Sequence, residues 1–155
     1  MATAMATTPK RSRSRSAARL AAVQALYQQE MEGTPVAQLL HEFHHHRLGA
    51  TIEDVEYADA EVAFFDDVVQ GALARRDELD GLIEAKLASG WALARLDKPM
   101  KAILRAGAYE LAARPDVPRA SVISEYVDVA KAFFDARESG FVNGLLDALA
   151  KDLRG

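Results

Sequence analysis

The sequence contains no cysteine, and this absence excludes several kinds of chemistry at once. A disulfide framework, a thiolate metal site and a cysteine nucleophile cannot form, which fits a protein of a reducing compartment. Long apolar segments are also missing. The longest stretch without a formally charged residue is Leu20–Gln29, ten residues, about half of what a membrane-spanning helix needs. We therefore expect a soluble, cytoplasmic protein.

The sequence also lacks two motifs that mark common catalytic sites. It has no glycine-rich phosphate loop and no nucleophile elbow. The only concentration of metal-ligating side chains is a cluster of four histidines: His41, His44, His45 and His46. His41 and His45 are one helical turn apart, a spacing that can hold a metal; Glu42 or Asp54 could be recruited as further ligands, but nothing in the sequence fixes them there. We favour a solvated helix end and expect no enzyme activity, metal or cofactor.

Basic residues are concentrated at the start of the chain, although the net charge is −4. Residues 1–19 contain no acid and five cations: Lys10, Arg11, Arg13, Arg15 and Arg19. This segment carries +5 and the remainder −9. Clustered cations bind phosphates by releasing condensed counterions, so the asymmetry indicates a polyanionic partner for the basic segment.

Two other interpretations of this segment are possible. Alternating Ser and Arg bury no apolar surface, so the segment could be a disordered, solubilising tail. Its acid-free composition also resembles an organellar transit peptide, whereas a basic n-region before an apolar core, as in a secretory signal, is absent. The basic run continues directly into core-forming residues, which a removable peptide should not do. Continuity with a helix instead favours an arm that binds RNA by becoming ordered on it.

Apolar residues recur at helical spacing through almost the whole chain. Leu20, Val23, Tyr27 and Met31 form one stripe of a first helix, which Gly33-Thr34-Pro35 ends. Further helices are expected at Val36–Leu48, at Asp59–Ala88 with a break or bend at Gly71 or Gly81, from an Asp97 N-cap to the turn "RPDVP", at Val122–Phe134 and at Val142–Leu153. Residues 49–57 are expected to form a loop, and no segment predicts a strand.

These patterns predict an all-α fold of about seven helices. We expect residues 1–14 to form a flexible basic arm and residues 15–155 to form one all-helical domain. Asn143-Gly144 often marks a hairpin, but the flanking apolar residues recur every three and four positions, so we expect a helix there. Phe133 and Phe134 are adjacent and point about 100° apart on a helix, so only one can face fully inward. The other could stack on a nucleobase.

Several blocks of the sequence, taken together, resemble the NusB family of transcription antitermination factors. The blocks are "RSAARLAAVQALYQ", "ELDGLI", "AILRAGAYEL", "DVPRASVISEYVDVAKAF" and "SGFVNGLLDAL", and they follow one another in the family's order. The resemblance covers nearly the whole chain after residue 10. It implies two small helical bundles and an arginine-rich arm that binds boxA RNA. It also implies a partnership with NusE, a small-subunit ribosomal protein, in elongation complexes with RNA polymerase and other Nus factors on rRNA operons.

The resemblance also implies roles for individual residues. RNA binding falls on the arm residues Lys10, Arg11, Arg13, Arg15 and Arg19 and on Phe134 and Phe141 of the late helices. The NusE-facing surface falls on Tyr27. The family would have a basic residue where this chain has Gly140, and Arg137 is a substitute for it.

Two rival functions follow from other considerations. Some RNA cytosine methyltransferases carry a similar domain, but this chain has no cysteine to serve as their nucleophile. The remaining alternative is a helical protein-interaction scaffold whose arm does not touch RNA.

Overall fold

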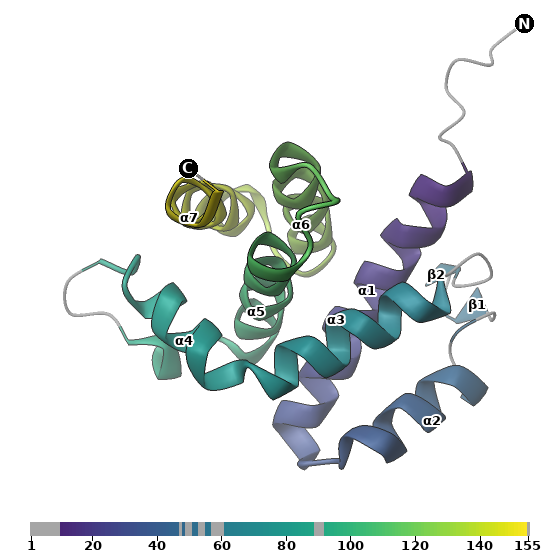
Figure 1. Cartoon of the computed structure of the whole chain (residues 1–155). Helices are drawn as coiled ribbons and strands as arrows, with labels where there is room; N and C mark the ends of the chain where they lie inside the picture. The colour runs from purple at the N-terminus through teal and green to yellow at the C-terminus, as the bar shows by residue number, and fades with distance from the viewer. Residues whose placement is uncertain are drawn as a thin grey trace, which may run out of the picture.

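The computed structural model describes residues 10–46, 48, 51–52, 55–56, 61–88 and 92–154, with side chains in all of these ranges except at 10–13, 51–52 and 55–56. This part of the chain forms seven α-helices, a short 3-10 helix and a two-stranded hairpin (Figure 1). The elements are α1 (Lys10–Glu32), α2 (Val36–His46), β1 (Thr51–Ile52), β2 (Val55–Glu56), α3 (Val62–Ala74), α4 (Arg76–Glu84), η2 (Leu93–Arg95), α5 (Lys98–Ala113), α6 (Arg119–Phe133) and α7 (Ala136–Arg154). The predicted all-α class is confirmed.

The helices form two groups that share α5. In the first group α1 packs along α3 and α5, and α2 packs against α1 and α3. In the second group α5, α6 and α7 pack against one another, and α4 adjoins α5. Figure 1 shows α5 between the α1–α3 pair and the α6–α7 pair. The buried apolar side chains of both groups form one continuous core.

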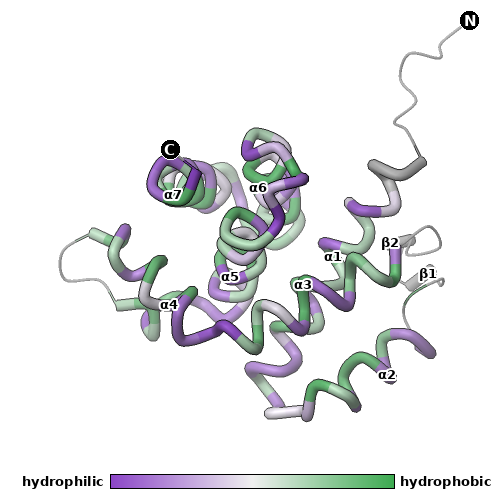
Figure 2. Tube along the Cα trace, in the orientation of Figure 1, coloured by the Kyte–Doolittle hydropathy of each residue, from purple (hydrophilic) through white to green (hydrophobic). Residues whose placement is uncertain are grey.

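The central helix α5 is buried on nearly every side. Its buried positions run almost without interruption from Met100 to Leu111, as expected for a helix surrounded by other helices. By contrast, hydrophobic and hydrophilic residues alternate along the outer helices in Figure 2, which is the pattern of amphipathic helices with one face on the core. Among the described helices, none is both long enough and apolar enough to cross a membrane.

The expected long helix over residues 59–88 is two helices, and the prediction of a break at Gly71 or Gly81 is wrong. The helices α3 and α4 separate at Arg75, whose backbone has φ −107° and ψ 20°. Gly71 lies inside α3, where an added Cβ would be 2.2 Å from ring atoms of Tyr109. Glycine at this position therefore allows α3 to approach α5 closely, and the close contact explains a residue whose helix propensity is poor.

Most other boundaries agree with the sequence patterns. Asn143 and Gly144 lie inside α7, so the helical interpretation of this pair is confirmed. Asp97 occupies the N-cap position of α5, although its side chain makes no capping hydrogen bond. The expectation of no strand is wrong for one small element: within residues 49–57, Thr51 pairs with Glu56 and Ile52 with Val55. Two-residue strands are too short to show an alternating pattern in the sequence.

Candidate nucleic-acid interface

The basic run at the start of the chain continues into helix α1. This helix begins at Lys10, so the last residues of the expected arm are helical. The side chains of Lys10, Arg11 and Arg13 lie outside the described residues. The structure does place the side chains of Arg15 and Arg19, which are one turn apart on α1.

Arg19 is buried and lies between the two helix groups. Only 4% of its surface is exposed. Its Nε and Nη2 atoms donate to the two carboxylate oxygens of Glu110 on α5 at 2.8 and 3.0 Å. Burial by itself would lower the pKa of this guanidinium, but the hydrogen bonds and charge of Glu110 outweigh burial and raise it. An RNA phosphate could reach Arg19 only by displacing a buried, bidentate carboxylate.

The Glu110 carboxylate accepts a further hydrogen bond, and a second carboxylate, Glu125 on α6, also contacts Arg19. Tyr126 on α6 donates its hydroxyl to Glu110 Oε2 at 2.5 Å, and burial followed by the Glu110 charge raises the pKa of this tyrosine well above its ordinary value. Glu125 Oε1 accepts from Arg19 Nη1 at 3.1 Å and from the Ser16 hydroxyl at 2.6 Å. This buried network joins α1 to α5 and α6, so Arg19 orients the helix that follows the arm.

Arg15 is also paired, though closer to the surface. Its side chain is 14% exposed, and its Nε lies 3.2 Å from Glu61 Oε2, just before α3. Its Nη1 is 4.0 Å from Asp116 in the turn between α5 and α6. The backbone N–H of Glu61 also donates to the Ser14 carbonyl at 3.0 Å. These three contacts fix the position of Ser14 and Arg15 in α1.

Phe64 on α3 is surrounded by arginines. The guanidinium carbons of Arg15, Arg19 and Arg114 lie 4.6, 4.8 and 4.9 Å from the centre of its ring. Arg114 is held by Asp67 at 2.9 Å, which also accepts the Tyr109 hydroxyl at 2.7 Å. Burial and this hydrogen bond raise the pKa of Tyr109 to about 12. Arg15 and Arg19 thus have aromatic and acidic partners within the fold.

The aromatic residues at the α6–α7 corner have a different environment. Phe141 on α7 and Phe133 at the end of α6 are each 39% exposed. Phe134, which sequence reasoning selected, is half-buried and packs partly against the core. The residues themselves left open whether Phe133 or Phe134 faces outward, and the family resemblance selected Phe134. The 100° offset between adjacent helical residues was the available signal, but it does not say which ring faces outward.

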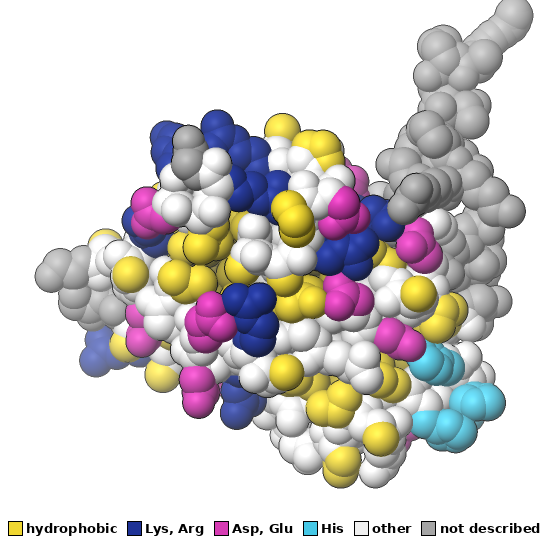
Figure 3. Space-filling view, in the orientation of Figure 1, with side chains coloured by type: hydrophobic (Ala, Val, Ile, Leu, Met, Phe, Trp, Pro, Cys, Tyr) yellow, Lys and Arg dark blue, Asp and Glu magenta, His cyan; other side chains and the backbone are white. Residues whose placement is uncertain are grey.

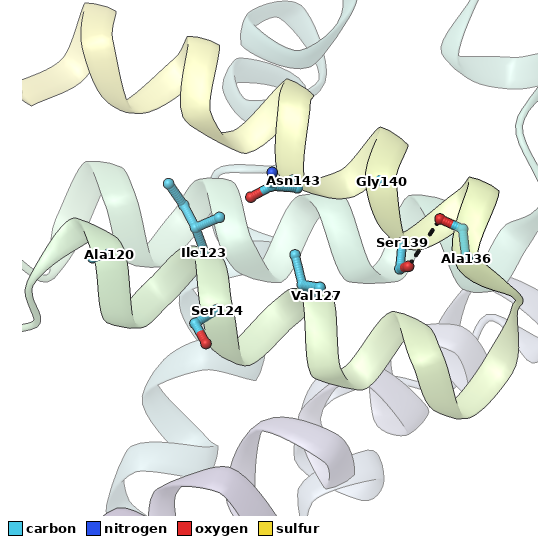
Figure 4. Close-up of a pocket in the computed structure, with 8 residues that line it drawn as sticks. All are labelled: Ala120, Ile123, Ser124, Val127, Ala136, Ser139, Gly140 and Asn143. Atoms are coloured by element: carbon cyan, nitrogen blue, oxygen red, sulfur yellow. Dashed lines mark hydrogen bonds between the residues drawn. The ribbon is translucent and has the colours of Figure 1, made fainter.

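Arg137 lies beside these rings at the start of α7. It is exposed and has no carboxylate within 4.0 Å in the described part of the chain. A Cβ added at nearby Gly140 would have no atom within 4 Å. A side chain would therefore fit at this position, where the family resemblance implies a basic residue. Gly140 lines a shallow groove of about 550 Å³ between α6 and α7 (Figure 4). Ser139 lies at one end of this groove and donates its hydroxyl to the Ala136 carbonyl of its own helix at 3.1 Å.

Tyr27 lies on an exposed part of α1, away from the paired arginines. It is 36% exposed, and Met31, one turn further along, is 52% exposed. The core face of α1 is made mainly of small residues: Ala18, Ala21, Ala22, Val23, Ala25 and Leu26. Tyr27 and Met31 therefore form an apolar surface that the described part of the chain leaves uncovered.

The histidine cluster lies at the end of α2. All four side chains are exposed, and they gather at one corner of the face shown in Figure 3. His44 Nε2 lies 2.6 Å from Asp66 Oδ1 on α3, and the rings of His41 and His45 are 4.3 Å apart. Within the described residues, no three metal-ligating side chains are grouped to hold an ion.

Comparison with known proteins identifies the family. The model of the NusB family matches residues 16–151. The transcription antitermination protein NusB of Sphingopyxis alaskensis is 74% identical over 94% of this chain and 97% of that protein. The protein of the same name in Caulobacter vibrioides is 51% identical over 90% of this chain and 94% of that protein.

Solved structures of the same family share the fold. NusB of T. maritima superposes with a TM-score of 0.73 at 29% identity, over 94% of this chain and 92% of that one. A chain in a crystal structure of antitermination factors NusB and NusE in complex with dsRNA has a TM-score of 0.72 at 26% identity, over 90% and 98%. Antitermination factors act on transcription without catalysing a reaction, so the expectation of a non-enzymatic protein is confirmed by these matches. The chain belongs to the NusB family of transcription antitermination factors.

Proposed function

We propose that this protein binds single-stranded, boxA-like RNA jointly with NusE, in the cytoplasm, and so supports processive transcription of rRNA operons. The observation that carries the proposal is the α6–α7 corner. Two exposed phenylalanine rings, Phe133 and Phe141, lie there with Arg137, which makes no ion pair within the described residues. Exposed rings beside a cation are suited to stacking on unpaired bases and contacting phosphate. A related NusB structure, in the complex named above, contains NusE and RNA.

The arm and the corner have complementary roles in this proposal. Lys10, Arg11 and Arg13, which belong to the start of α1, supply phosphate contacts. Arg15 lies between the RNA-binding cations and the structural Arg19, because it can contact a phosphate only by giving up its ion pair with Glu61. Arg19 acts indirectly by holding α1 against α5. Phe133, Phe134 and Phe141 present the aromatic surface.

The NusE contact is proposed for the exposed part of α1. Tyr27 and Met31 offer uncovered apolar area, and the acidic remainder of the chain complements a basic ribosomal protein. Replacing Tyr27 with Ala should lower the affinity for NusE more than the affinity for RNA alone. Equal losses for both ligands would remove Tyr27 from the NusE surface. The wider assembly with RNA polymerase and other Nus factors is part of the same proposal.

A titration separates this function from that of a scaffold without RNA binding. Fluorescence anisotropy with a boxA-like oligonucleotide and a scrambled one, at several salt concentrations and with or without NusE, measures both sequence preference and coupling. We expect tighter binding of the boxA-like RNA and a further 5- to 150-fold gain with NusE, the range typical of coupled sites. Absence of RNA binding in all of these series would favour the scaffold.

A further inference from the structure

The turn between α5 and α6 places an arginine beside the basic start of α1. Arg114 follows the last residue of α5, and its guanidinium carbon lies 4.9 Å from the ring centre of Phe64, the same ring that Arg15 of α1 approaches to 4.6 Å. Phe64 is buried, so its ring holds both guanidiniums in fixed places. Arg114 therefore extends the run of cations on α1 to a second element of the fold.

The two edges of the Arg114 guanidinium have different partners. Its Nη1 atom donates to Asp67 at 2.9 Å, and this carboxylate also accepts the Tyr109 hydroxyl. Its Nε and Nη2 atoms donate to the two carboxylate oxygens of Asp116 at 3.1 and 3.0 Å. Asp67 keeps Arg114 oriented when Asp116 moves away. The edge with two parallel donors is therefore the one that another oxyanion can occupy.

Asp116 is the member of this arrangement that is easiest to displace. Its side chain is 53% exposed, whereas that of Arg114 is 22% exposed. The backbone on either side is fixed, because Arg154 of α7 donates to the carbonyls of Arg114 at 2.8 Å and Val117 at 2.6 Å. Release of the carboxylate therefore needs the rotation of one exposed side chain and no change in the turn. An ion pair this exposed contributes little to stability.

The charges at this edge suit an anion that is always ionised. Arg15 Nη1 also lies 4.0 Å from Asp116, so the carboxylate is within reach of two guanidiniums. The hydrogen bonds from Arg114 hold the pKa of Asp116 below its ordinary value, against a small opposing effect of burial, and the charges of Arg114 and Arg15 add to this lowering. A phosphodiester carries a permanent negative charge. The basic run precedes Arg15 on the same helix, so an RNA strand held by that run brings phosphates to this turn.

We propose that the Nε–Nη2 edge of Arg114 is a phosphate-binding site for the RNA, and that Asp116 occupies it in the free protein as an internal competitor. Binding exchanges one oxyanion for another: the Asp116 carboxylate turns into solvent and a phosphate takes its place across the two donors. Affinity for RNA is lower than an unpaired arginine would give, because the internal pair must first break. This inference rests on the proposed RNA-binding function and adds to it Arg114 and Asp116, which the sequence patterns did not select as binding residues.

Removing the charge of the competitor tests the proposal. Asp116→Asn keeps the shape of the side chain, and the full chain is titrated with a boxA-like single-stranded oligonucleotide by fluorescence anisotropy at several salt concentrations. We expect Asp116→Asn to tighten RNA binding by about three- to fivefold, the upper part of the range for a surface ion pair. The slope of log affinity against log salt should steepen by up to about 0.7, because no released carboxylate takes up a cation when the phosphate binds.

Two further variants show whether the effect acts through Arg114. Glu78→Gln is the matched control, because Glu78 forms the same two-donor pair with Arg75, at 2.9 and 2.8 Å, on another part of the surface. It should change RNA affinity by less than about 1.5-fold. Arg114→Gln should weaken RNA binding, and adding Asp116→Asn to it should change affinity by less than about 1.5-fold. Thermal melting verifies folding, and the comparison of Asp116→Asn with Glu78→Gln does not depend on the Arg114 variant.

The outcomes separate this inference from the proposed function. If wild-type protein binds RNA and Asp116→Asn binds it no more tightly, the competitor proposal is overturned and the RNA-binding function stands. An equal gain in Glu78→Gln would show an effect of net charge alone, and an equal gain in the Arg114→Gln background would show that Asp116 does not act through Arg114; either result overturns the proposal. If Asp116→Asn changes the affinity for NusE and not for RNA, the edge serves an acidic group of the protein partner, and the proposal again fails. If neither wild-type protein nor Asp116→Asn binds RNA, both the inference and the proposed function fail.

Discussion

The start of α1 and the α6–α7 corner carry residues to which the sequence assigned the same role, yet their environments are opposite. At the start of α1, Arg15 and Arg19 are paired with carboxylates from four other segments. At the corner, Arg137 has no such partner among the described residues and lies with two exposed rings. A guanidinium that is already paired and desolvated must lose its partner before it can bind a phosphate, whereas an exposed one need not.

The comparison shows that residue type does not establish availability. Arg19 lies in the segment with the strongest RNA-binding pattern, but its geometry is that of a structural residue: 4% exposed, with both Glu110 oxygens as acceptors. Arg137 lies in a segment without a basic pattern and is free of described ion pairs. RNA contacts are therefore expected from the basic run before Arg15 and from the corner.

The largest effect should come from breaking the buried pair. Replacing Arg19 with Met leaves Glu110 buried and charged without a cation, with only the Tyr126 hydroxyl donating to its carboxylate, so the free energy of unfolding should fall by about 3–5 kcal/mol. Urea denaturation measures this. Replacing Arg137 with Met, as a matched control, should change it by less than about 0.5 kcal/mol. The double variant Arg19→Met/Glu110→Met should recover part of the loss, and equal losses for Arg19 and Arg137 would contradict the structural role.

Removing the basic run should have the next largest effect, on RNA rather than on stability. Deleting residues 1–13 retains Ser14, whose carbonyl accepts from Glu61, and removes Lys10, Arg11 and Arg13. RNA affinity should fall at least about tenfold. The slope of log affinity against log salt should become shallower by about 2, because each of the three lost phosphate contacts contributes roughly 0.7 to it. Anisotropy titrations measure both values. Replacing the same three cations with Gln should reproduce them, and an unchanged slope would mean that other cations make the phosphate contacts.

Replacing Phe133 with Leu should lower RNA affinity with little change in stability, whereas replacing Phe134 with Leu should lower stability more. Phe133→Leu should weaken RNA binding by about 1 kcal/mol with an unchanged salt slope, because stacking does not release counterions. Phe133 is exposed, so stability should change by less than about 0.5 kcal/mol. Phe134→Leu should lower stability more, since this ring packs partly against the core. Thermal melting measures the stability of both variants, and RNA titration measures their affinity. A larger stability loss in Phe133→Leu than in Phe134→Leu would mean that Phe133, not Phe134, packs against the core.

The smallest effect should come from an ion pair at the other end of α1. Glu30 accepts from Arg105 at 2.9 Å and from Lys101 at 3.1 Å. Burial opposes ionisation, but these hydrogen bonds hold the pKa of Glu30 below its ordinary value. Its contribution is therefore present at neutral pH and is lost as the pH falls through the lowered pKa. Between about pH 5 and pH 3, wild-type protein should lose about 0.5 kcal/mol more stability than Glu30→Gln in urea denaturation. Identical pH profiles would show that this pair contributes nothing.

Local patterns were sufficient for the elements of this fold. Apolar spacing predicted the helices, although it gave α3 and α4 as one, and Gly33-Thr34-Pro35 and the turn "RPDVP" ended α1 and α5 close to where the structure does. The concentration of cations before Arg19 was also evident from the sequence, as was the acidic remainder of the chain. These features depend on residues within a few turns of one another, so they can be recognised without the fold.

The availability of each candidate residue was decided by the tertiary structure. Arg19 is paired with Glu110, 91 positions away in the sequence, and Gly71 is explained by the ring of Tyr109 on another helix. Whether Phe133 or Phe134 faces outward depends on where α7 and the core lie relative to the end of α6. A one-residue rotation of a helix changes which side chain is buried but leaves its composition and periodicity unchanged. The sequence therefore determined which helices form, and the packing of distant segments determined which of their side chains remain free to bind.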